Sequence, residues 1–324
     1  MCKLQDQRDQ HFTNIHSINT NAQNSASILP IKPQQDFKGI WVPIITPFKD
    51  GNIDIIALRN LVLRMTRSGV HGLVVCGTTG EAAHLSDDEK ETVLKTVLET
   101  VNPNYPVMMG ISGADTLSVT KKIRHFNQFR ICAYLISAPY YIRPSQTGIV
   151  IHFLMIADAA SHPIVIYNIP ARAGINIELP SLIKLSEDSR FVAIKESSSN
   201  INQIVDTINR TSLNVLCGDD SLLLQTMCAG GVGAISATAH VKPELCLDIY
   251  NQILSGNFLA ARAQFNQLLP LIRLLFSEPN PAPIKAILSA RGDIQEELRL
   301  PMLPVTRYLK KQLLSEIVNL EIQY

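Results

Sequence analysis

Residues 72–89 read GLVVCGTTGEAAHLSDDE, and this stretch contains the unit from which the fold can be predicted. The run Gly72–Gly77 is short and apolar, which is typical of a parallel strand that is buried on both faces. Ser86 and Glu89 then form the S-x-x-E pattern of a capping box, which predicts that a helix begins there. The stretch is therefore one strand–helix unit with a polar loop between the two elements.

The same unit recurs along the chain in both directions from this stretch. The predicted strands are Gly39–Thr46, Gly72–Gly77, Pro106–Ile111, Ile131–Ala138, Pro163–Tyr167, Phe191–Lys195, Leu213–Cys217 and Val232–Ala237. The helices that follow them are expected to begin near Asp54, Ser86, Asp115, Ser145, Leu179, Asn200, Asp219 and Lys242. Eight alternating units predict an α/β protein of the (β/α)8 TIM-barrel class.

A doubly wound sheet is the alternative fold for alternating strands and helices. That fold would place a glycine-rich phosphate-binding turn after the first strand. The first predicted strand ends instead in Thr46, Pro47 and Phe48, which offer no such turn. The barrel is therefore the preferred prediction.

The barrel accounts for only part of the chain, and we expect three regions. Residues 1–36 are polar and rich in Gln and Asn, which predicts a disordered tail, with a docking or regulatory segment as the alternative. Residues 37–257 would form the catalytic barrel. Residues 258–324 would form a helical appendage, because amphipathic patterns at 260–276, 283–290 and 305–320 are not interrupted by strands.

The composition excludes several classes of protein. Of the 324 residues, 46% are hydrophobic, and 29 Lys and Arg against 28 Asp and Glu give a net charge of +1. A disordered protein would be less hydrophobic and more highly charged, and a nucleic-acid-binding protein would be more basic. The sequence contains no apolar run of about 18 residues, so we expect no membrane span.

Targeting and cysteine patterns favour a cytoplasmic location. The first residues lack the apolar segment of a secretory signal. The six cysteines include no C-x-x-C pair, and their spacing in a chain of this length does not suggest a disulfide framework. We therefore expect a reduced, cytoplasmic protein.

The sixth predicted strand ends in the first candidate catalytic residue. In a (β/α)8 barrel the chemistry takes place at the carboxyl ends of the strands. Lys195 follows four apolar residues in such a position. Burial disfavours the ammonium form of lysine, and a neutral amine can attack a carbonyl to form a Schiff base. The alternative is a Lys195 that reaches solvent or pairs with Glu196.

Two further strand ends carry candidate polar residues. Tyr167 could relay protons at the barrel mouth, or it could be an interior aromatic residue with a satisfied hydroxyl. Arg172 lies five residues later and can bind a carboxylate through two parallel hydrogen bonds. In the loop Gly77–Glu81, Thr78 and Thr79 offer amides and hydroxyls for an anion, although a plain turn is the alternative.

Motifs for metals and cofactors are absent from the sequence. None of the eight histidines belongs to an H-E-x-x-H pattern, so we expect no metal site. The pair Asp219–Asp220 is interpreted as a helix cap, and the glycines at 230–233 are interpreted as a tight turn and not as a dinucleotide fingerprint. Lysine, tyrosine, hydroxyls and arginine at one barrel mouth suit amine catalysis on an α-keto acid.

Seven motifs, in order, resemble those of the 4-hydroxy-tetrahydrodipicolinate synthase family, within the pyruvate-dependent class I aldolase superfamily. They are GTTGE at 77–81, PYYIRPSQ at 139–146, YNIPARAG at 167–174, IKE at 194–196, CGDD at 217–220, EPNPAPIK at 278–285 and LRLPMLP at 298–304. The resemblance extends from about residue 37 to the last predicted helix.

This resemblance implies catalytic roles for individual residues. Lys195 would form an imine with pyruvate, so that no separate cofactor is needed. Thr78 and Thr79 would bind the pyruvate carboxylate. Tyr167 would move the proton that converts imine into enamine, and Thr79 would link it to Tyr141 of a neighbouring subunit. The family also implies a homotetramer built from tight dimers.

The resemblance further implies a second substrate, L-aspartate 4-semialdehyde. Arg172 would hold its carboxylate, and the carbonyls of Gly218 and Ile235 would line the pocket near the lysine. Sugar-acid lyases of the superfamily generally lack this arginine. A pyruvate aldolase or lyase for a hydroxy-keto acid is therefore the alternative, and a barrel that has lost catalysis and serves in binding is a third possibility.

The sequence also departs from the family pattern. Ser197–Ser199, Ala173 and His240 replace other residues near the site, which bears on kinetics or the exact substrate. The positions that correspond to a lysine-inhibition site are Ala82, Asp87, Lys90, Ala114, Ser118 and Tyr140. Only Tyr140 fits that pattern, so we expect weak or absent inhibition by lysine.

Overall fold

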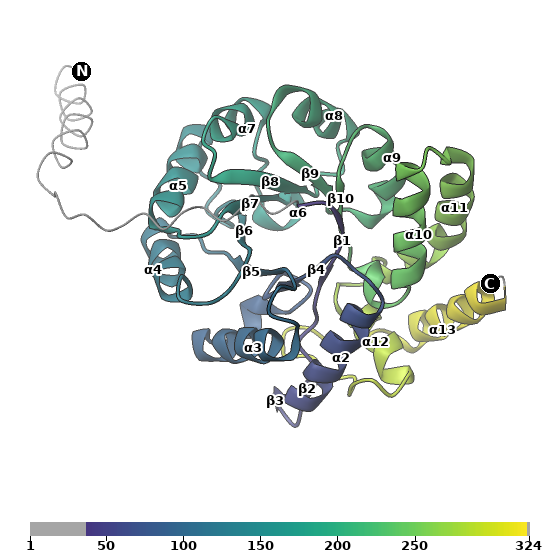
Figure 1. Ribbon diagram of the computed structural model, residues 1–324. Helices are drawn as coiled ribbons and strands as arrows, with labels where there is room; N and C mark the ends of the chain where they lie inside the picture. Colours follow the sequence, from purple (N-terminus) through teal and green to yellow (C-terminus); the bar gives the residue numbers. More distant parts are fainter. Residues whose placement is uncertain (1–36, 323–324) are drawn as a thin grey trace, which may run out of the picture. The chain divides into compact units, whose positions relative to one another are not determined.

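Eight parallel strands close into a barrel in the order β1-β10-β9-β8-β7-β6-β5-β4 (Figure 1). The structure is a computed structural model and describes residues 37–322; the predicted tail at 1–36 lies outside the described residues. The strands are β1 Gly39–Pro43, β4 Gly72–Val75, β5 Val107–Ile111, β6 Ala133–Ser137, β7 Ile164–Asn168, β8 Phe191–Glu196, β9 Asn214–Cys217 and β10 Gly233–Ile235. The predicted (β/α)8 fold is confirmed.

Helices follow the strands and surround the barrel (Figure 1). They are α2 Ile55–Arg67, α3 Asp87–Thr100, α4 Thr116–Phe126, α5 Gln146–Ala159, α7 Leu179–Ser186, α8 Ile201–Arg210, α9 Leu223–Cys228 and α10 Pro243–Leu254. Several begin at a side chain that accepts a backbone N–H of the first turn, as Asp54, Ser86 and Ser145 do. At Ser86 the complete capping box forms with Glu89, as the sequence predicts.

Several short elements between strands and helices were not predicted, and they include the 3-10 turns η2 Ala82–His84 and η4 Thr238–His240. A two-residue hairpin joins β2 Phe48–Lys49 to β3 Asn52–Ile53, and the helix α6 Pro170–Ala173 follows β7. The segment after β9 begins as a 3-10 turn, η3 Asp220–Leu222. The prediction of a cap at Asp219–Asp220 is right for Asp219 and wrong for Asp220, whose carboxylate is buried and accepts hydrogen bonds from Thr238.

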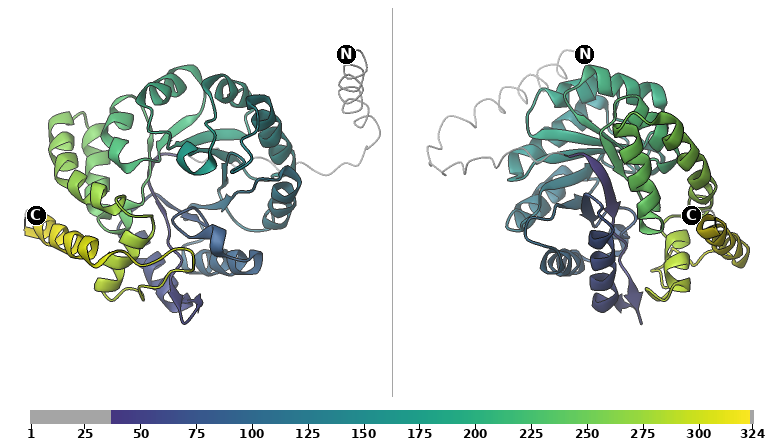
Figure 2. Two further views of the ribbon diagram at one scale, coloured as in Figure 1. Left: turned by 180° about the vertical axis from the view of Figure 1, so that it is seen from behind. Right: turned by 45° about the vertical axis from the view of Figure 1, so that its right-hand side comes forward.

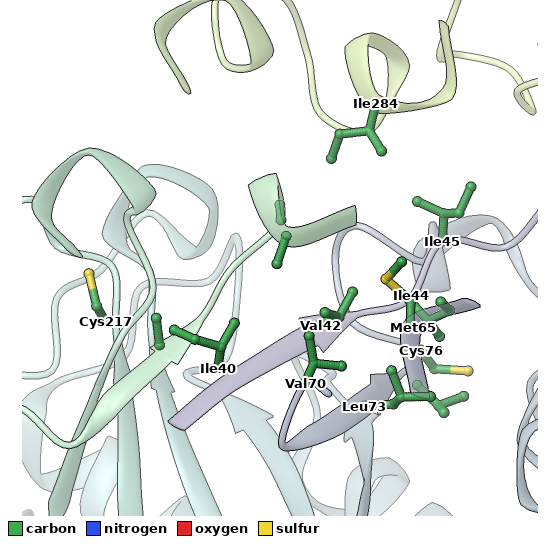
Figure 3. Packing of buried hydrophobic residues seen from close by; sticks show 14 of the residues in the cluster. Ile40, Val42, Ile44, Ile45, Met65, Val70, Leu73, Cys76, Cys217 and Ile284 are labelled. Atoms are coloured by element: carbon green, nitrogen blue, oxygen red, sulfur yellow. The ribbon is translucent and has the colours of Figure 1, made fainter. Parts of the chain in front are cut away.

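Three C-terminal helices complete the described chain: α11 Phe258–Leu275, α12 Ala282–Ala290 and α13 Arg307–Ile322. They lie along one side of the barrel, where α11 packs on α10 and α13 packs on both α11 and α12 (Figure 2). The side chain of Ile284 on α12 points toward the segment after β1 that carries Ile44 and Ile45 (Figure 3). These residues belong to one hydrophobic core, so the helices extend the barrel core.

Two further features of the described residues concern the length of the helices and the state of the cysteines. No helix within 37–322 is long and apolar enough to cross a membrane. The cysteines that the structure describes, at 76, 132, 217, 228 and 246, are all free thiols.

Candidate active site

Lys195 lies at the carboxyl end of β8 and is 6% exposed. In the sheet it is the direct neighbour of Tyr167 on β7, and its Nζ lies 4.3 Å from the centre of the Tyr167 ring. The side chain of Glu196 is directed elsewhere, because it accepts hydrogen bonds from Asn168 and Gln203. The structure thus contradicts the alternative in which Lys195 reaches solvent or pairs with Glu196.

The stem of Lys195 packs against the backbone of Gly218. A Cβ atom at this glycine would lie 2.8 Å from Cγ and 2.9 Å from Cε of Lys195, and 2.1 Å from Oγ of Ser197. Ile235, at the end of β10, is 1% exposed and packs in the same inner cluster as Tyr167. The absence of a side chain at Gly218 therefore makes the room that Lys195 occupies.

Asp220 supplies a buried carboxyl group close to the lysine. Burial raises the pKa of Asp220, while hydrogen bonds from Thr238 and the charge of Lys195 oppose this effect. Its Oδ2 accepts from the amide and the hydroxyl of Thr238 at 2.7 and 2.6 Å. Asp220 therefore anchors the segment after β10 beneath the site.

The loop Gly77–Glu81 is held from several sides. Thr79 is 3% exposed, and its Oγ1 accepts a hydrogen bond of 3.0 Å from Nδ2 of Asn280. The carbonyl of Gly80 accepts from the hydroxyl of Thr46 at 2.7 Å. A plain surface turn would leave such groups in water, so the loop is part of the protein interior.

Glu81 closes this loop with a buried ion pair. Its backbone adopts the left-handed conformation, with φ 55°, and its carboxylate lies 2.5 Å from Nζ of Lys285 on α12. The side chains of Glu81 and Lys285 are 1% and 0% exposed. Burial lowers the pKa of Lys285, an effect that the charge of Glu81 opposes.

A cavity of about 530 Å³ opens at this end of the barrel, and Thr78, Tyr167, Arg172 and Asn280 are among its lining residues. Tyr167 lies on β7 and Thr78 lies in the loop after β4, whereas Arg172 reaches the cavity from α6. Lys195, Thr79, Gly218 and Ile235 are not lining residues. The structure thus brings the predicted residues to one end of the barrel, some in the cavity wall and some in the buried layer around Lys195.

Tyr141 is the exception among the predicted site residues. Its side chain is 89% exposed, and its own chain does not direct it into the cavity, where Tyr140 is found instead. Its backbone has a φ of 72°, and its N–H donates to the carbonyl of Ala173 at 3.2 Å. The loop that carries Tyr141 is therefore attached to the helix that carries Arg172.

A buried network of amides holds the helix of Arg172. Burial raises the pKa of Glu196, and hydrogen bonds from Asn168, Ser198 and Gln203 oppose this rise. Asn168 also accepts from the N–H of Ile177 at 3.0 Å, at the end of the loop that contains α6. The carboxylate of Glu196 thus connects, through Asn168, the strand of Lys195 to the loop of Arg172.

The sequence alone predicts no role for Asn280 or Lys285, and for Glu196 it suggests only the alternative of pairing with Lys195. Asn280 and Lys285 lie in the EPNPAPIK motif and Glu196 lies in IKE, so the motifs mark these positions but not their contacts. Within the described residues, no group of three or more His, Cys, Asp or Glu side chains could hold a metal ion.

Residues 36–320 match the model of the dihydrodipicolinate synthetase family. The chain is 38% identical over 279 residues to 4-hydroxy-tetrahydrodipicolinate synthase 2 of Clostridium acetobutylicum, covering 85% of this chain and 98% of that protein. It is 40% identical over 273 residues to the synthase of Syntrophobacter fumaroxidans, covering 83% and 94%. A solved dihydrodipicolinate synthase from Acinetobacter baumannii, complexed with pyruvate, superposes with a TM-score of 0.86 at 29% identity, covering 89% and 100%. The chain therefore belongs to the dihydrodipicolinate synthetase family.

Proposed function

We propose that this enzyme condenses pyruvate with L-aspartate 4-semialdehyde to give 4-hydroxy-tetrahydrodipicolinate, a reaction of lysine and diaminopimelate biosynthesis. The observation that carries the proposal is the buried Lys195, whose Nζ lies against Tyr167 at the carboxyl end of the barrel. A desolvated lysine beside a phenol suits imine formation followed by proton transfer. The relatives named above carry the same activity in their names.

The first half of the reaction activates pyruvate. The amine of Lys195 attacks the ketone carbon, and a water molecule leaves as the imine forms. Tyr167 takes a proton from the methyl group, so that the imine becomes an enamine. Thr78 and Thr79 bind the carboxylate of pyruvate, and Thr79 links Tyr167 to Tyr141 of a neighbouring copy of the chain.

The second half consumes the aldehyde. The enamine carbon attacks the aldehyde carbon, whose oxygen takes up a proton, and the imine to Lys195 forms again. The amino group of the second substrate then attacks the imine carbon and displaces the lysine amine, which closes the ring. Arg172 at the cavity holds the carboxylate of this substrate, and the carbonyls of Gly218 and Ile235 face the reacting atoms.

Reduction with borohydride in the presence of pyruvate tests the Schiff base. We expect a stable adduct whose mass gain equals pyruvate less one water plus two hydrogens, located on Lys195 by peptide mapping. Lys195→Arg should give no adduct, whereas Lys184→Arg, at a surface lysine paired with Glu187, should react like the wild type. An unmodified Lys195 in the wild-type protein would refute the proposal.

A pyruvate aldolase or lyase for a hydroxy-keto acid is the second candidate. Arg172 at the cavity favours the synthase, because an amino acid aldehyde carries a second carboxylate and a polyol chain does not. Turnover with L-aspartate 4-semialdehyde and none with sugar acids is expected. We further propose that the enzyme works without a metal, in the cytoplasm, and as a homotetramer that shares Tyr141 between subunits.

A further inference from the structure

Asn280 enters the barrel end from the segment between α11 and α12. Its Nδ2 donates to Oγ1 of Thr79 at 3.0 Å, and the two residues are 9% and 3% exposed. They are 201 positions apart in the sequence. Asn280 is also a lining residue of the cavity, together with Thr78 and Tyr167.

The place of Asn280 is fixed by the helix that follows it. On α12, Lys285 pairs with Glu81, its Nζ donates to the carbonyl of Glu297 at 2.9 Å, and it lies 4.2 Å from the centre of the Phe48 ring. Glu81 and Thr79 belong to the same loop. The segment Asn280–Lys285 therefore grips this loop at two points, one of them the hydroxyl of Thr79.

The hydrogen-bonding capacity of a hydroxyl gives this contact a consequence. A threonine hydroxyl has one hydrogen to donate and two lone pairs that accept. A proton relay through it needs one neighbour that donates and one that accepts. Because Asn280 occupies one lone pair, the Thr79 hydroxyl keeps one lone pair and its own hydrogen, which is what two relay neighbours require.

We propose that Asn280 is a positioning residue that sets the direction of proton transfer through Thr79. This inference rests on the proposed function, in which Thr79 links Tyr167 to Tyr141. The amide nitrogen of Asn280 can only donate, so it prevents the Thr79 hydrogen from turning toward α12. The C-terminal helical region thereby takes part in the relay without contacting the reacting atoms.

Asn280→Asp tests the direction of the hydrogen bond, because it keeps the shape and replaces the donor. An ionised Asp accepts the hydrogen of Thr79 and removes it from the relay. We expect the exchange of pyruvate methyl hydrogens in D₂O, followed by NMR, to slow about 10- to 100-fold at pH 8. Borohydride trapping on Lys195 should persist. As the pH falls toward the pKa of the new carboxyl, its protonated form donates again, and the ratio of variant to wild-type exchange should rise.

Asn214→Asp is the matched control. It introduces the same change at the opposite end of the barrel. Asn214 is the first residue of β9, and its Nδ2 donates to the carbonyl of Val192 on β8. Its exchange rate should follow that of the wild type at every pH.

The outcomes separate the inference from the proposed function. If Asn280→Asp exchanges the methyl hydrogens of pyruvate as fast as the wild type at every pH, the inference is overturned. Loss of borohydride trapping in this variant would also overturn it, because it would mean that Asn280 serves pyruvate binding. A wild-type protein that neither traps nor exchanges pyruvate would overturn the proposed function itself. If the Asp variant does not fold, Asn280→Leu removes the donor without a charge; slow exchange at every pH supports the inference, and wild-type exchange refutes it.

Discussion

The space beside Gly218 is filled by the side chain of Lys195, so a larger residue does not fit at position 218. A methyl group there would lie within 2.9 Å of two carbons of Lys195, and the lysine stem would have to move. Misplacement of a reacting group by about 1 Å can lower a rate about 100-fold. We therefore expect Gly218→Ala to lower kcat about 100-fold, as measured by steady-state turnover.

Gly148→Ala provides the control for this substitution. At Gly148, in the first turn of α5, an added Cβ would meet its nearest atoms at an ordinary 3.5 Å. Alanine favours a helix by about 1 kcal/mol over glycine, so the control should be active and slightly more stable. Full activity of Gly218→Ala would show that the lysine tolerates displacement.

His240 is buried in its neutral form. Its Nε2 accepts from the N–H of Ile45 at 3.1 Å, and its Nδ1 lies 3.0 Å from the carbonyl of Ala237. A neutral ring with its hydrogen on Nδ1 satisfies both contacts, whereas a second hydrogen would point at the N–H of Ile45. Burial lowers the pKa of His240 to about 4. This departure from the family pattern therefore lies in the core and not among the substrate-binding residues.

The stability of the protein should depend on this histidine at mildly acidic pH. Between pH 6.5 and 4 the unfolded chain takes up a proton on His240 that the folded chain does not, so the free energy of unfolding falls as the pH falls. His240 alone would account for about 3 kcal/mol over this window. In urea unfolding, the free energy of unfolding of His240→Asn should fall less between pH 7 and 4.5 than that of the wild type. Equal pH dependence in the two proteins would contradict the assignment.

Single residues differed in how well they could be predicted. Lys195 and Tyr167 could be recognised because a polar side chain at the end of an apolar strand is conspicuous. Asn280 could not be assigned, because its partner Thr79 lies far away in the sequence and no local pattern encodes the contact. The role of Tyr141 could not be predicted from local sequence either, because its side chain is exposed on its own chain.

At the scale of elements, one buried ion pair docks α12 onto the loop after β4. Removing one partner of a buried pair leaves an uncompensated charge, which costs about 3–5 kcal/mol. Lys285→Met should therefore lower the free energy of unfolding in urea by about this amount. Glu81→Gln combined with Lys285→Met should lose much less than the sum of the single variants, because no buried charge remains.

The pair of Arg59 and Glu99 offers a surface comparison. Its side chains are 44% and 61% exposed, so Arg59→Met should cost less than about 1 kcal/mol. For the buried pair, if the losses in the free energy of unfolding of Glu81→Gln and Lys285→Met simply add in the double variant, Glu81 and Lys285 are not coupled.

The regular elements could be predicted better than the connections. Long apolar runs and strong caps such as Ser86 determined the strands and helices within a few residues. The hairpin β2–β3 and the four-residue helix α6 contain too few residues to produce a periodic pattern. In the sequence Asp220 resembles a helix cap, because its buried partner Thr238 lies on a different strand-to-helix loop.

At the scale of the whole molecule, the exposed Tyr141 predicts sites that are completed by a second copy. Lys195→Arg and Tyr141→Phe should each be nearly inactive alone. In a mixed dimer, the chain with an intact lysine receives the intact tyrosine of the other chain. Random mixing after dissociation should restore about one quarter of the wild-type activity. No recovery in verified mixed dimers would contradict the sharing of Tyr141.

Charge near the cavity argues against regulation by a cationic amino acid. Nζ of Lys90 and Nζ of Lys122 both contact Oδ1 of Asp87, at 3.1 and 3.2 Å, so this carboxylate is already neutralised. Lys90 and Lys122 are among the residues that line the cavity. We expect half-inhibition by L-lysine only above about 1 mM, as measured by titration of the initial rate. Inhibition in the micromolar range would overturn this expectation.

The contacts of α12 and of Asn280 before it also determine when the site can form during protein synthesis. The loop of Thr79 leaves the ribosome early, but Asn280 follows 201 residues later. At about 5–20 residues per second, the nascent chain carries an unfinished loop for about 10–40 seconds. The barrel cannot close until β10 has been synthesised and pairs with β1. Until then the unpaired edge of β1 is available to other chains. Products of translation that end before Asn280 would therefore lack its hydrogen bond to the Thr79 loop, and those that end before β10 would also keep the open edge of β1.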